Sequence, residues 1–216
     1  FYTVLGTSLN LIMTIAAGYP LSKRDFRGRG GITFLFTLTM FFSGGMVPNF
    51  LLIKNLDMYN SIWALLLPGC VSAWNLVIMR TYFQTSIPEE ICESAYIDGC
   101  SNISTLLRIV LPLSMPIIAV MVIFYGVGHW NSYFSALLYL KDRDKYPLSL
   151  VLREILLQGM GQEKSGAEVV DSVADLLLFE TLKYAVIIVS SVPMLTLYPA
   201  LQRYFVKGTM VGSLKG

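Results

Sequence analysis

Few side chains in this sequence are of the types that carry catalysis, and their spacing predicts no catalytic site. There is one histidine, His129, and there are three cysteines, Cys70, Cys92 and Cys100, without a CxxC pair. A zinc site uses about four such ligands at close spacing, so we expect no metal site. No Asp, Glu or Lys lies deep in an apolar stretch, and no nucleophile–base pair is evident. We therefore expect no enzyme activity from this chain.

The sequence does contain a candidate segment for binding a partner. It is acidic and extends over residues 86–112. Pro88 suits the first turn of a helix, and Glu89 and Glu90 place negative charge where the helix dipole favours it. Apolar residues recur at helical spacing and predict one apolar face, formed by Ile87, Ile91 and Ala95.

A turn and a second helix are predicted to follow. Gly99 fits the position just after a helix end that needs a left-handed backbone, and Ser101 or Asn102 could cap the next helix. A short helix outside the bilayer with a small apolar face is typical of a docking element for a partner. The alternative is a helix resting on lipid head groups, which would favour Lys and Arg on its polar face, whereas this one is acidic.

The elements that position this segment are membrane helices. Of the 216 residues, 55% are hydrophobic and only 14% are charged, with a mean hydropathy of +0.62. Ordinary soluble domains carry about 25% charged residues. Five stretches of 19 to 22 residues lack any charge, and about 20 residues cross a bilayer; they are residues 1–22, 32–53, 58–79, 109–128 and 184–202.

The expected fold is therefore all-α, a polytopic membrane helix bundle with five spans in this chain. A transmembrane barrel would show shorter alternating segments of about ten residues. The net charge of only +2 excludes a nucleic-acid binder. The chain opens inside an apolar run without a basic region or a cleavage site, so we expect a further segment upstream rather than a signal peptide.

Lys and Arg are concentrated in two of the connecting segments. Segment 23–31 carries four basic residues against one acid, and the tail after residue 202 carries three basic residues and no acid. The positive-inside rule places both in the cytoplasm. Five spans then place segment 86–112 inside as well, and segments 54–57 and 141–183 outside.

Several predicted spans contain residues that interrupt helices. The clearest are Gly44-Gly45 with Pro48, then Pro68, and then Pro112 with Pro116. Freed backbone groups are tolerated in a membrane where other helices or a water-filled cavity satisfy them. Two interpretations stay open, ordinary kinks in a bundle and helices bent around a translocation path.

The outer segment 141–183 is predicted to hold one amphipathic helix. Apolar residues recur at helical spacing within 148–158, with Arg153 and Glu154 on the opposite face. This helix could dock a partner protein or seal a partner membrane subunit. The acidic stretch from Glu163 to Asp175 is interpreted as a solvated loop.

The acidic inner segment resembles the EAA loop of permease subunits of binding-protein-dependent ABC importers. That family pattern reads E-A-A-x-x-x-G, then nine residues, then I-x-L-P. Here Glu93-Ser94-Ala95 precedes Asp98-Gly99, and Ile109-x-Leu111-Pro112 follows after nine residues. Only Ser94 departs from the pattern, and it is also a small residue.

The resemblance implies a coupling helix that sits in a cleft of an ATP-binding subunit. The residues it assigns to coupling are Glu93, Ser94, Ala95, Asp98, Gly99, Leu111 and Pro112. It implies six spans in the full family fold, and a transmembrane domain over 1–216 with its C-terminus in the cytoplasm of a bacterial cell. The implied partners are two ATP-binding cassette subunits, a second permease chain, an extracytoplasmic solute-binding protein and membrane lipid. Because no Gly-x-x-x-x-Gly-Lys-Ser/Thr loop occurs here, ATP and Mg are expected on the partner subunits alone.

Other segments resemble permeases of carbohydrate importers of the maltose-permease type. They include the segment from Ala17 to Gly28, the tail from Gln202 to Gly208 and the Trp130-Asn131-x-Tyr133 element. The segments Gly44–Pro48 and Tyr146–Leu148 resemble a subgroup for oligosaccharides such as aldouronate and alginate fragments. The expected function is import of a sugar or oligosaccharide by alternating access.

A few polar and aromatic residues are candidates for the substrate pathway or for contact with the binding protein: Asn75, His129, Trp130, Asn131 and Tyr133. Sugars are bound by aromatic faces and a few placed polar groups. The alternatives are an interfacial aromatic belt for Trp130 and Tyr133, and structural hydrogen bonds for Asn75 and His129. Two functional alternatives also stay open, an ABC permease for a non-sugar solute and a secondary carrier or channel without an ATPase.

Overall fold

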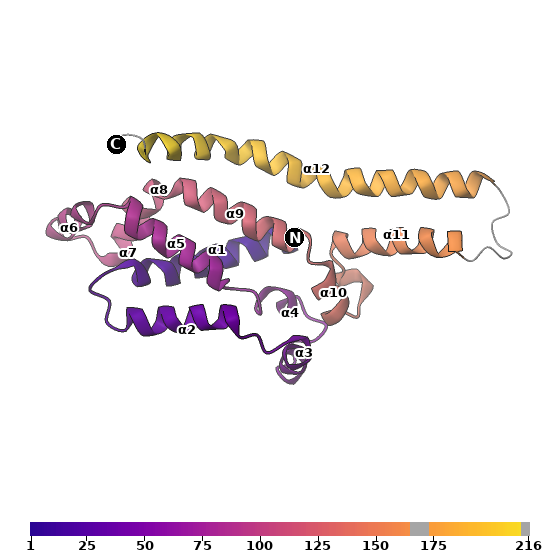
Figure 1. The fold of residues 1–216 in the computed structure, drawn as a ribbon, viewed down its shortest axis with the longest axis horizontal. Coiled ribbons are helices and arrows are strands. Elements are labelled where there is room, and N and C mark those ends of the chain that lie inside the picture. Colours follow the sequence, from indigo (N-terminus) through magenta and orange to yellow (C-terminus); the bar gives the residue numbers. More distant parts are fainter. Residues whose placement is uncertain (165–172, 213–216) are drawn as a thin grey trace.

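The protein is built from helices, as its composition predicts. A computed structural model describes residues 1–164 and 173–212, with side chains in 1–157, 181–197 and 199–202, and no strand occurs among them (Figure 1). The helices are α1 (Tyr2–Ser22), α2 (Arg29–Phe41), α3 (Met46–Asn55), α4 (Trp63–Leu66), α5 (Ala73–Ser86), α6 (Glu89–Ile97), α7 (Asn102–Thr105), α8 (Leu111–Leu113), α9 (Met115–Trp130), α10 (Tyr133–Tyr139), α11 (Leu148–Lys164) and α12 (Val173–Gly212).

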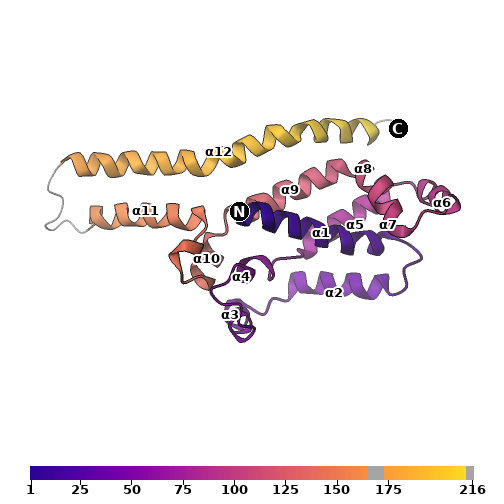
Figure 2. The same ribbon diagram turned by 180° about the vertical axis from the view of Figure 1, so that it is seen from behind.

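Helix α1 is the centre of the bundle and packs against both α5 and α9 (Figures 1 and 2). Small residues allow close approach, because a Cβ added at Gly18 would lie 3.3 Å from Met79 Cγ. The hydroxyl groups of Thr14 and Tyr125 form a buried hydrogen bond of 2.7 Å between α1 and α9. Close packing of small residues and interhelical hydrogen bonds are what hold helices together in lipid, where apolar burial alone gives little.

Two of the predicted spans are sharply bent. Between α2 and α3 the axis turns by 116°, at Gly45 with φ +85. Between Asn102–Leu113 and α9 it turns by 83°, at Ser114 between Pro112 and Pro116. The interrupting residues therefore break the helices where the sequence predicts.

The prediction of five spans is confirmed only in part. Two helices of the described chain are long and apolar enough to cross a membrane unbroken, Tyr2–Ser22 and Thr181–Gln202, and there are up to four spans if each bent pair counts as one. The segment 58–79 was expected to be one span and is not one helix. It contains α4, which ends at Leu66, and the start of α5 at Ala73, because Pro68 lacks a backbone donor and Gly69 has no side chain to pack.

The connecting segments 23–28 and 87–101 contact each other at one end of the bundle, the end that carries α6. Arg24 forms an ion pair of 3.1 Å with Glu89. Arg80, in the middle of α5, donates from Nε to the carbonyl of Leu21 at the end of α1, at 3.0 Å. These contacts put segments 23–28 and 87–101 on the same side, as the charge pattern predicts.

At the opposite end of the bundle, the residues around Asn60 contact those around Asp142. Asn60, in a left-handed conformation with φ 59, donates from Nδ2 to Asp142 at 2.8 Å. Lys145 Nζ donates to the Asn60 carbonyl and to Asp142, each at 2.9 Å. The hydrogen bonds from Lys145 and Asn60 lower the pKa of Asp142. This Asn60–Asp142–Lys145 cluster joins residues that are more than 80 positions apart in the chain.

The predicted amphipathic helix is present as α11, which runs beside α12 (Figure 1). Helix α12 begins at Val173, within the predicted outer segment 141–183. Part of the acidic stretch, residues 165–172, lies outside the described residues.

Only 6% of the most apolar stretch of α12 is buried within this chain. Pro193 and Pro199 lie inside α12 without ending it.

Candidate functional site

The end of α6 has the glycine-terminated geometry that the sequence predicts. Gly99 adopts φ +80, the Cys100 amide donates to the Ala95 carbonyl at 2.9 Å, and the Gly99 amide donates to the Tyr96 carbonyl at 3.0 Å. This pair of bonds is the Schellman motif, which closes a helix end around a left-handed residue. Of the two predicted caps for the next helix, Ser101 is the one used, since its Oγ accepts from the Ser104 amide at 3.3 Å.

The orientation of α6 separates a buried face from an exposed one. Cys92 and Ala95 are buried together with Ile87. Ile91 was expected on this face and instead is 37% exposed, because the inward stripe passes through positions 92 and 95, one turn apart. The predicted coupling residues on the other face are exposed: Glu93, Ser94, Asp98 and Gly99.

Apolar side chains also lie exposed beside these carboxylates. Ile97 is 87% exposed and Ile103 is 70% exposed, and Tyr96 and Leu107 are exposed as well. The α6–α7 turn thus presents charge and apolar area together, a combination typical of a protein-binding surface. Leu111 and Pro112 lie farther along, in the short helix α8 at the bend, half-buried and exposed respectively.

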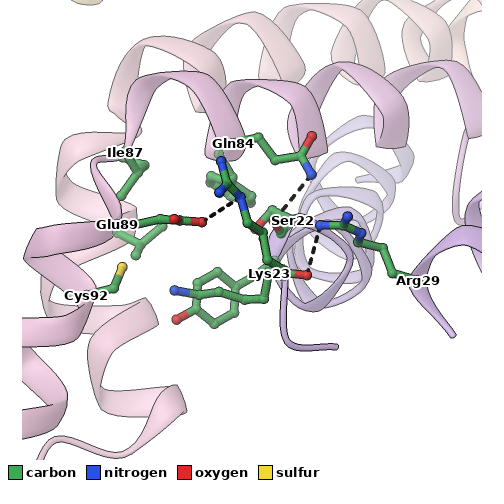
Figure 3. A pocket seen from close by; sticks show the side chains of 11 residues that line it. Ser22, Lys23, Arg29, Gln84, Ile87, Glu89 and Cys92 are labelled. Carbon is green, nitrogen blue, oxygen red and sulfur yellow. Dashed lines mark hydrogen bonds and ion pairs between the residues drawn. The ribbon is translucent and has the colours of Figure 1, made fainter. Parts of the chain in front are cut away.

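A pocket of about 260 Å³ lies behind α6, and Figure 3 shows the residues around it. The ammonium of Lys23 lies over the rings of Tyr19 and Tyr96, at 5.2 and 5.7 Å from their centroids. Gln84 donates to the Ser22 carbonyl at 3.3 Å, and Arg29 donates to the Lys23 carbonyl at 3.3 Å (Figure 3). The pocket is held by contacts between α1, α5 and the segment leading to α2, and Glu89 and Cys92 of α6 line it.

A central cavity of about 430 Å³ lies among α1, α4, α5 and α9. Two of the predicted pathway residues, Asn75 and His129, both line it. Asn75 is buried, and its backbone amide donates to the Ser72 side chain that caps α5. The ring Nε2 of His129 lies 2.8 Å from Asn10 Oδ1, and Asn10 Nδ2 donates to the Gly69 carbonyl. His129 therefore has the structural hydrogen bond foreseen for it, at the wall of a cavity.

The other three predicted pathway residues line a separate pocket of about 320 Å³. We call it the α11 pocket; it is lined by Trp130, Asn131, Tyr133, Ser149, Leu152, Arg153, Leu156, Val186 and Ser190. Trp130 Nε1 donates to the Ser190 carbonyl at 2.9 Å, which joins the end of α9 to α12. The structure thus divides the five predicted residues between two sites.

Sequence reasoning missed the polar partners that come from other elements. Asn10 and the pair of Thr14 and Tyr125 carry no local motif, and they meet only when α1 crosses α9. Arg153 was predicted only as part of the polar face of a helix, yet it lines a pocket.

No group of three or more His, Cys, Asp or Glu side chains that could hold a metal ion occurs in the described residues.

Known transport proteins are similar to this chain over nearly its whole length. Residues 10–211 match the family model described as "Binding-protein-dependent transport system inner membrane component". The polygalacturonan/rhamnogalacturonan transport system permease protein YtcP of Bacillus subtilis is 43% identical over 216 residues, which cover 100% of this chain and 74% of that protein. The trehalose/maltose transport system permease protein MalG of Thermococcus litoralis is 29% identical, covering 99% of this chain and 74% of that one.

A solved structure shares the fold. It is the crystal structure of a bacterial ABC transporter involved in the import of the acidic polysaccharide alginate, and one of its chains matches with a TM-score of 0.82 and 32% identity. The match covers 95% of this chain and 72% of that chain. The chain belongs to the family of binding-protein-dependent transport system inner membrane components.

Proposed function

We propose that this chain is a permease subunit of an ATP-driven importer that moves a sugar or oligosaccharide into the cytoplasm. Relatives named as permeases for polygalacturonan and for trehalose and maltose support the saccharide cargo. The observation that carries the proposal is the α6–α7 turn. Its exposed Glu93 stands at the motif position, on a short helix whose end is fixed by the left-handed Gly99.

The packing behind α6 gives a route by which a partner's movement reaches the membrane helices. Ile87 and Cys92 are buried in the same apolar cluster as Tyr19 of α1 and Phe83 of α5. The Arg24–Glu89 ion pair adds a second connection, although at an exposed site it contributes little to stability. A force on α6 would therefore move α1 and α5 with it, and these two helices wall the central cavity.

Transport by alternating access needs a bundle with two arrangements of its helices. The central cavity would form part of the path, and the 83° bend before α9 offers a place where one arrangement can change into the other. The exposed length of α12 fits contact with a second permease chain as well as with lipid. Energy would come from two ATP-binding cassette subunits, and cargo from an extracytoplasmic binding protein.

The charge pattern supports a definite orientation in a bacterial cytoplasmic membrane. We place the α6 end in the cytoplasm, with coupling loop 86–112 and the C-terminus, and segment 141–183 outside.

Replacing Glu93 tests the proposed coupling. We expect Glu93→Ala in the assembled importer to lower retention of the ATPase subunits, and cargo-stimulated ATP hydrolysis, by roughly tenfold, because a charge-assisted hydrogen bond contributes about 1.5–3 kcal/mol. Asp144→Ala is the matched control, since this exposed acid lies at the opposite end. Retention would be measured by co-purification, and hydrolysis by phosphate release in proteoliposomes.

Three outcomes would count against the proposal. Unchanged retention and hydrolysis in Glu93→Ala would remove α6 as the coupling element. Uptake of labelled oligosaccharide that proceeds without ATP would favour a secondary carrier or channel instead, and ATP-dependent uptake restricted to amino acids or peptides would favour a non-sugar importer.

A further inference from the structure

In the α11 pocket, one cation has no acidic partner among the described residues. The Cζ atom of Arg153 lies 4.6 Å from the centroid of the Tyr133 ring, and the Arg153 side chain is half-buried. Among the described residues no carboxylate lies within ion-pair distance of it, because the neighbouring Glu154 pairs with Arg143 at 3.6 Å. A guanidinium stacked on an aromatic ring is held in place and keeps its planar fork of donors free for a ligand.

A second polar group in the same pocket is also unused. The buried Oγ of Ser149, one turn before Arg153 on α11, has no hydrogen-bond partner in the described structure. Buried hydroxyl groups are nearly always hydrogen-bonded, so an orphan that lines an open pocket indicates a missing partner. Ser149 and Arg153 are four positions apart on α11 and therefore lie on one face of the helix.

The remaining walls of the pocket are mostly apolar, with Asn131 and Ser190 as further polar residues. Trp130 is fixed by its 2.9 Å bond to the Ser190 carbonyl, and Leu152, Leu156 and Val186 complete the apolar lining. The volume of about 320 Å³ is at the small end of the range of about 300–1000 Å³ for ligand sites. Aromatic and aliphatic walls fit the apolar faces of a sugar ring, and a hydroxyl donor with a free guanidinium fits a carboxylate on that ring.

We infer that the α11 pocket is a subsite for a uronate residue of an acidic oligosaccharide. Arg153 forms a bidentate pair with the sugar carboxylate, Ser149 donates to one of its oxygens or to a ring hydroxyl, and Trp130 covers the apolar face of the ring. Arg153 is thus a specificity residue that favours acidic over neutral saccharides, because a neutral sugar leaves the half-buried guanidinium unpaired. This inference rests on the proposed saccharide cargo.

Transport of two matched probes tests the inference in the complete importer with its binding protein and ATPase. The probes are a galacturonate trisaccharide and the same trisaccharide with its carboxyl groups methyl-esterified. We expect the wild-type importer to favour the acid, and Arg153→Gln to raise KM for the acid by roughly tenfold while leaving the ester nearly unchanged. Arg153→Lys keeps the charge but loses the fork, so its KM for the acid falls between those of wild type and Arg153→Gln.

Arg143→Gln is the control, since Arg143 pairs with Glu154 and lies outside the α11 pocket. Ser149→Ala is a second variant with a smaller expected rise in KM for the acid. An equal loss for both probes in Arg153→Gln would indicate a structural or lipid-binding role and overturn the inference, as would no change for either probe. If the wild-type importer moves a neutral oligosaccharide with ATP but neither probe, the inference fails while the proposed function stands. If it moves no saccharide with ATP, the proposed function itself fails.

Discussion

At the level of single residues, Gly6 of α1 leaves the space that the His129 ring of α9 occupies. A Cβ added at Gly6 would lie 2.6 Å from Cε1 and Nε2 of the His129 ring, and that same Nε2 lies 2.8 Å from Asn10 Oδ1. The absence of a side chain at Gly6 therefore determines where the ring can sit. Through Asn10 and the Gly69 carbonyl, this contact also holds the segment between α4 and α5.

We predict that Gly6→Ala destabilises the bundle by about 1–3 kcal/mol, because the ring must move and the bond to Asn10 is lost. The measurement is the midpoint of thermal unfolding of the purified importer in detergent. Gly128→Ala is the matched control, since nothing lies within 4 Å of a Cβ at that position of α9. Equal midpoints for the two variants would show that α1 and α9 do not meet in this way.

At the level of elements, the turn between α6 and α7 depends on one backbone conformation. Gly99 has φ +80, and nothing lies within 4 Å of a Cβ built there, so the requirement is conformational rather than steric. Substitution at this position therefore tests the turn itself, without altering the neighbouring side chains.

We predict that Gly99→Val weakens coupling, because a β-branched residue in a left-handed conformation costs about 1–2 kcal/mol or more and loosens the end of α6. Retention of ATPase subunits should fall several-fold. Gly99→Asn is the control and should retain nearly full coupling, since Asn adopts this conformation far more readily. Co-purification measures both, and equal loss in the two variants would mean that side-chain bulk matters instead of the backbone.

At the level of the whole molecule, the two ends of the bundle are tied by different contacts. The Arg24–Glu89 ion pair joins connecting segments at the α6 end, and the Asn60–Asp142–Lys145 cluster joins them at the other. Such long-range contacts fix which segments share a side of the membrane, independently of how many helices count as spans. The excess of Lys and Arg in segment 23–31 favours the cytoplasm for the α6 end.

We predict two classes of labelling for single cysteines introduced into a cysteine-free chain and probed with a membrane-impermeant maleimide. Asp57→Cys and Asp144→Cys should react in intact cells, whereas Arg27→Cys and Asp98→Cys should react only in inverted vesicles. All four positions are exposed, so burial does not confound the comparison. Reaction of Asp98→Cys from outside would contradict the proposed orientation and, with it, the coupling role of α6.

The sequence by itself determined the features that depend on local chemistry. Hydropathy set the helical membrane class, since backbone groups in lipid must be satisfied within each segment. The Gly99 turn, and a cap at Ser101 or Asn102, followed from backbone preferences of single residues, and the structure selects Ser101. The relative sides of the connecting segments followed from the distribution of Lys and Arg, which acts over short loops.

Only the tertiary structure decided which distant residues meet. It divided Asn75 and His129 from Trp130 and Tyr133, turned Ile91 outward, and split residues 58–79 into separate helices. It also brought Arg153 and Ser149 to the same pocket as Trp130. These outcomes depend on helix crossings and on bends at Gly and Pro, where small differences in packing select one arrangement, and the sequence pattern of a single helix does not encode them.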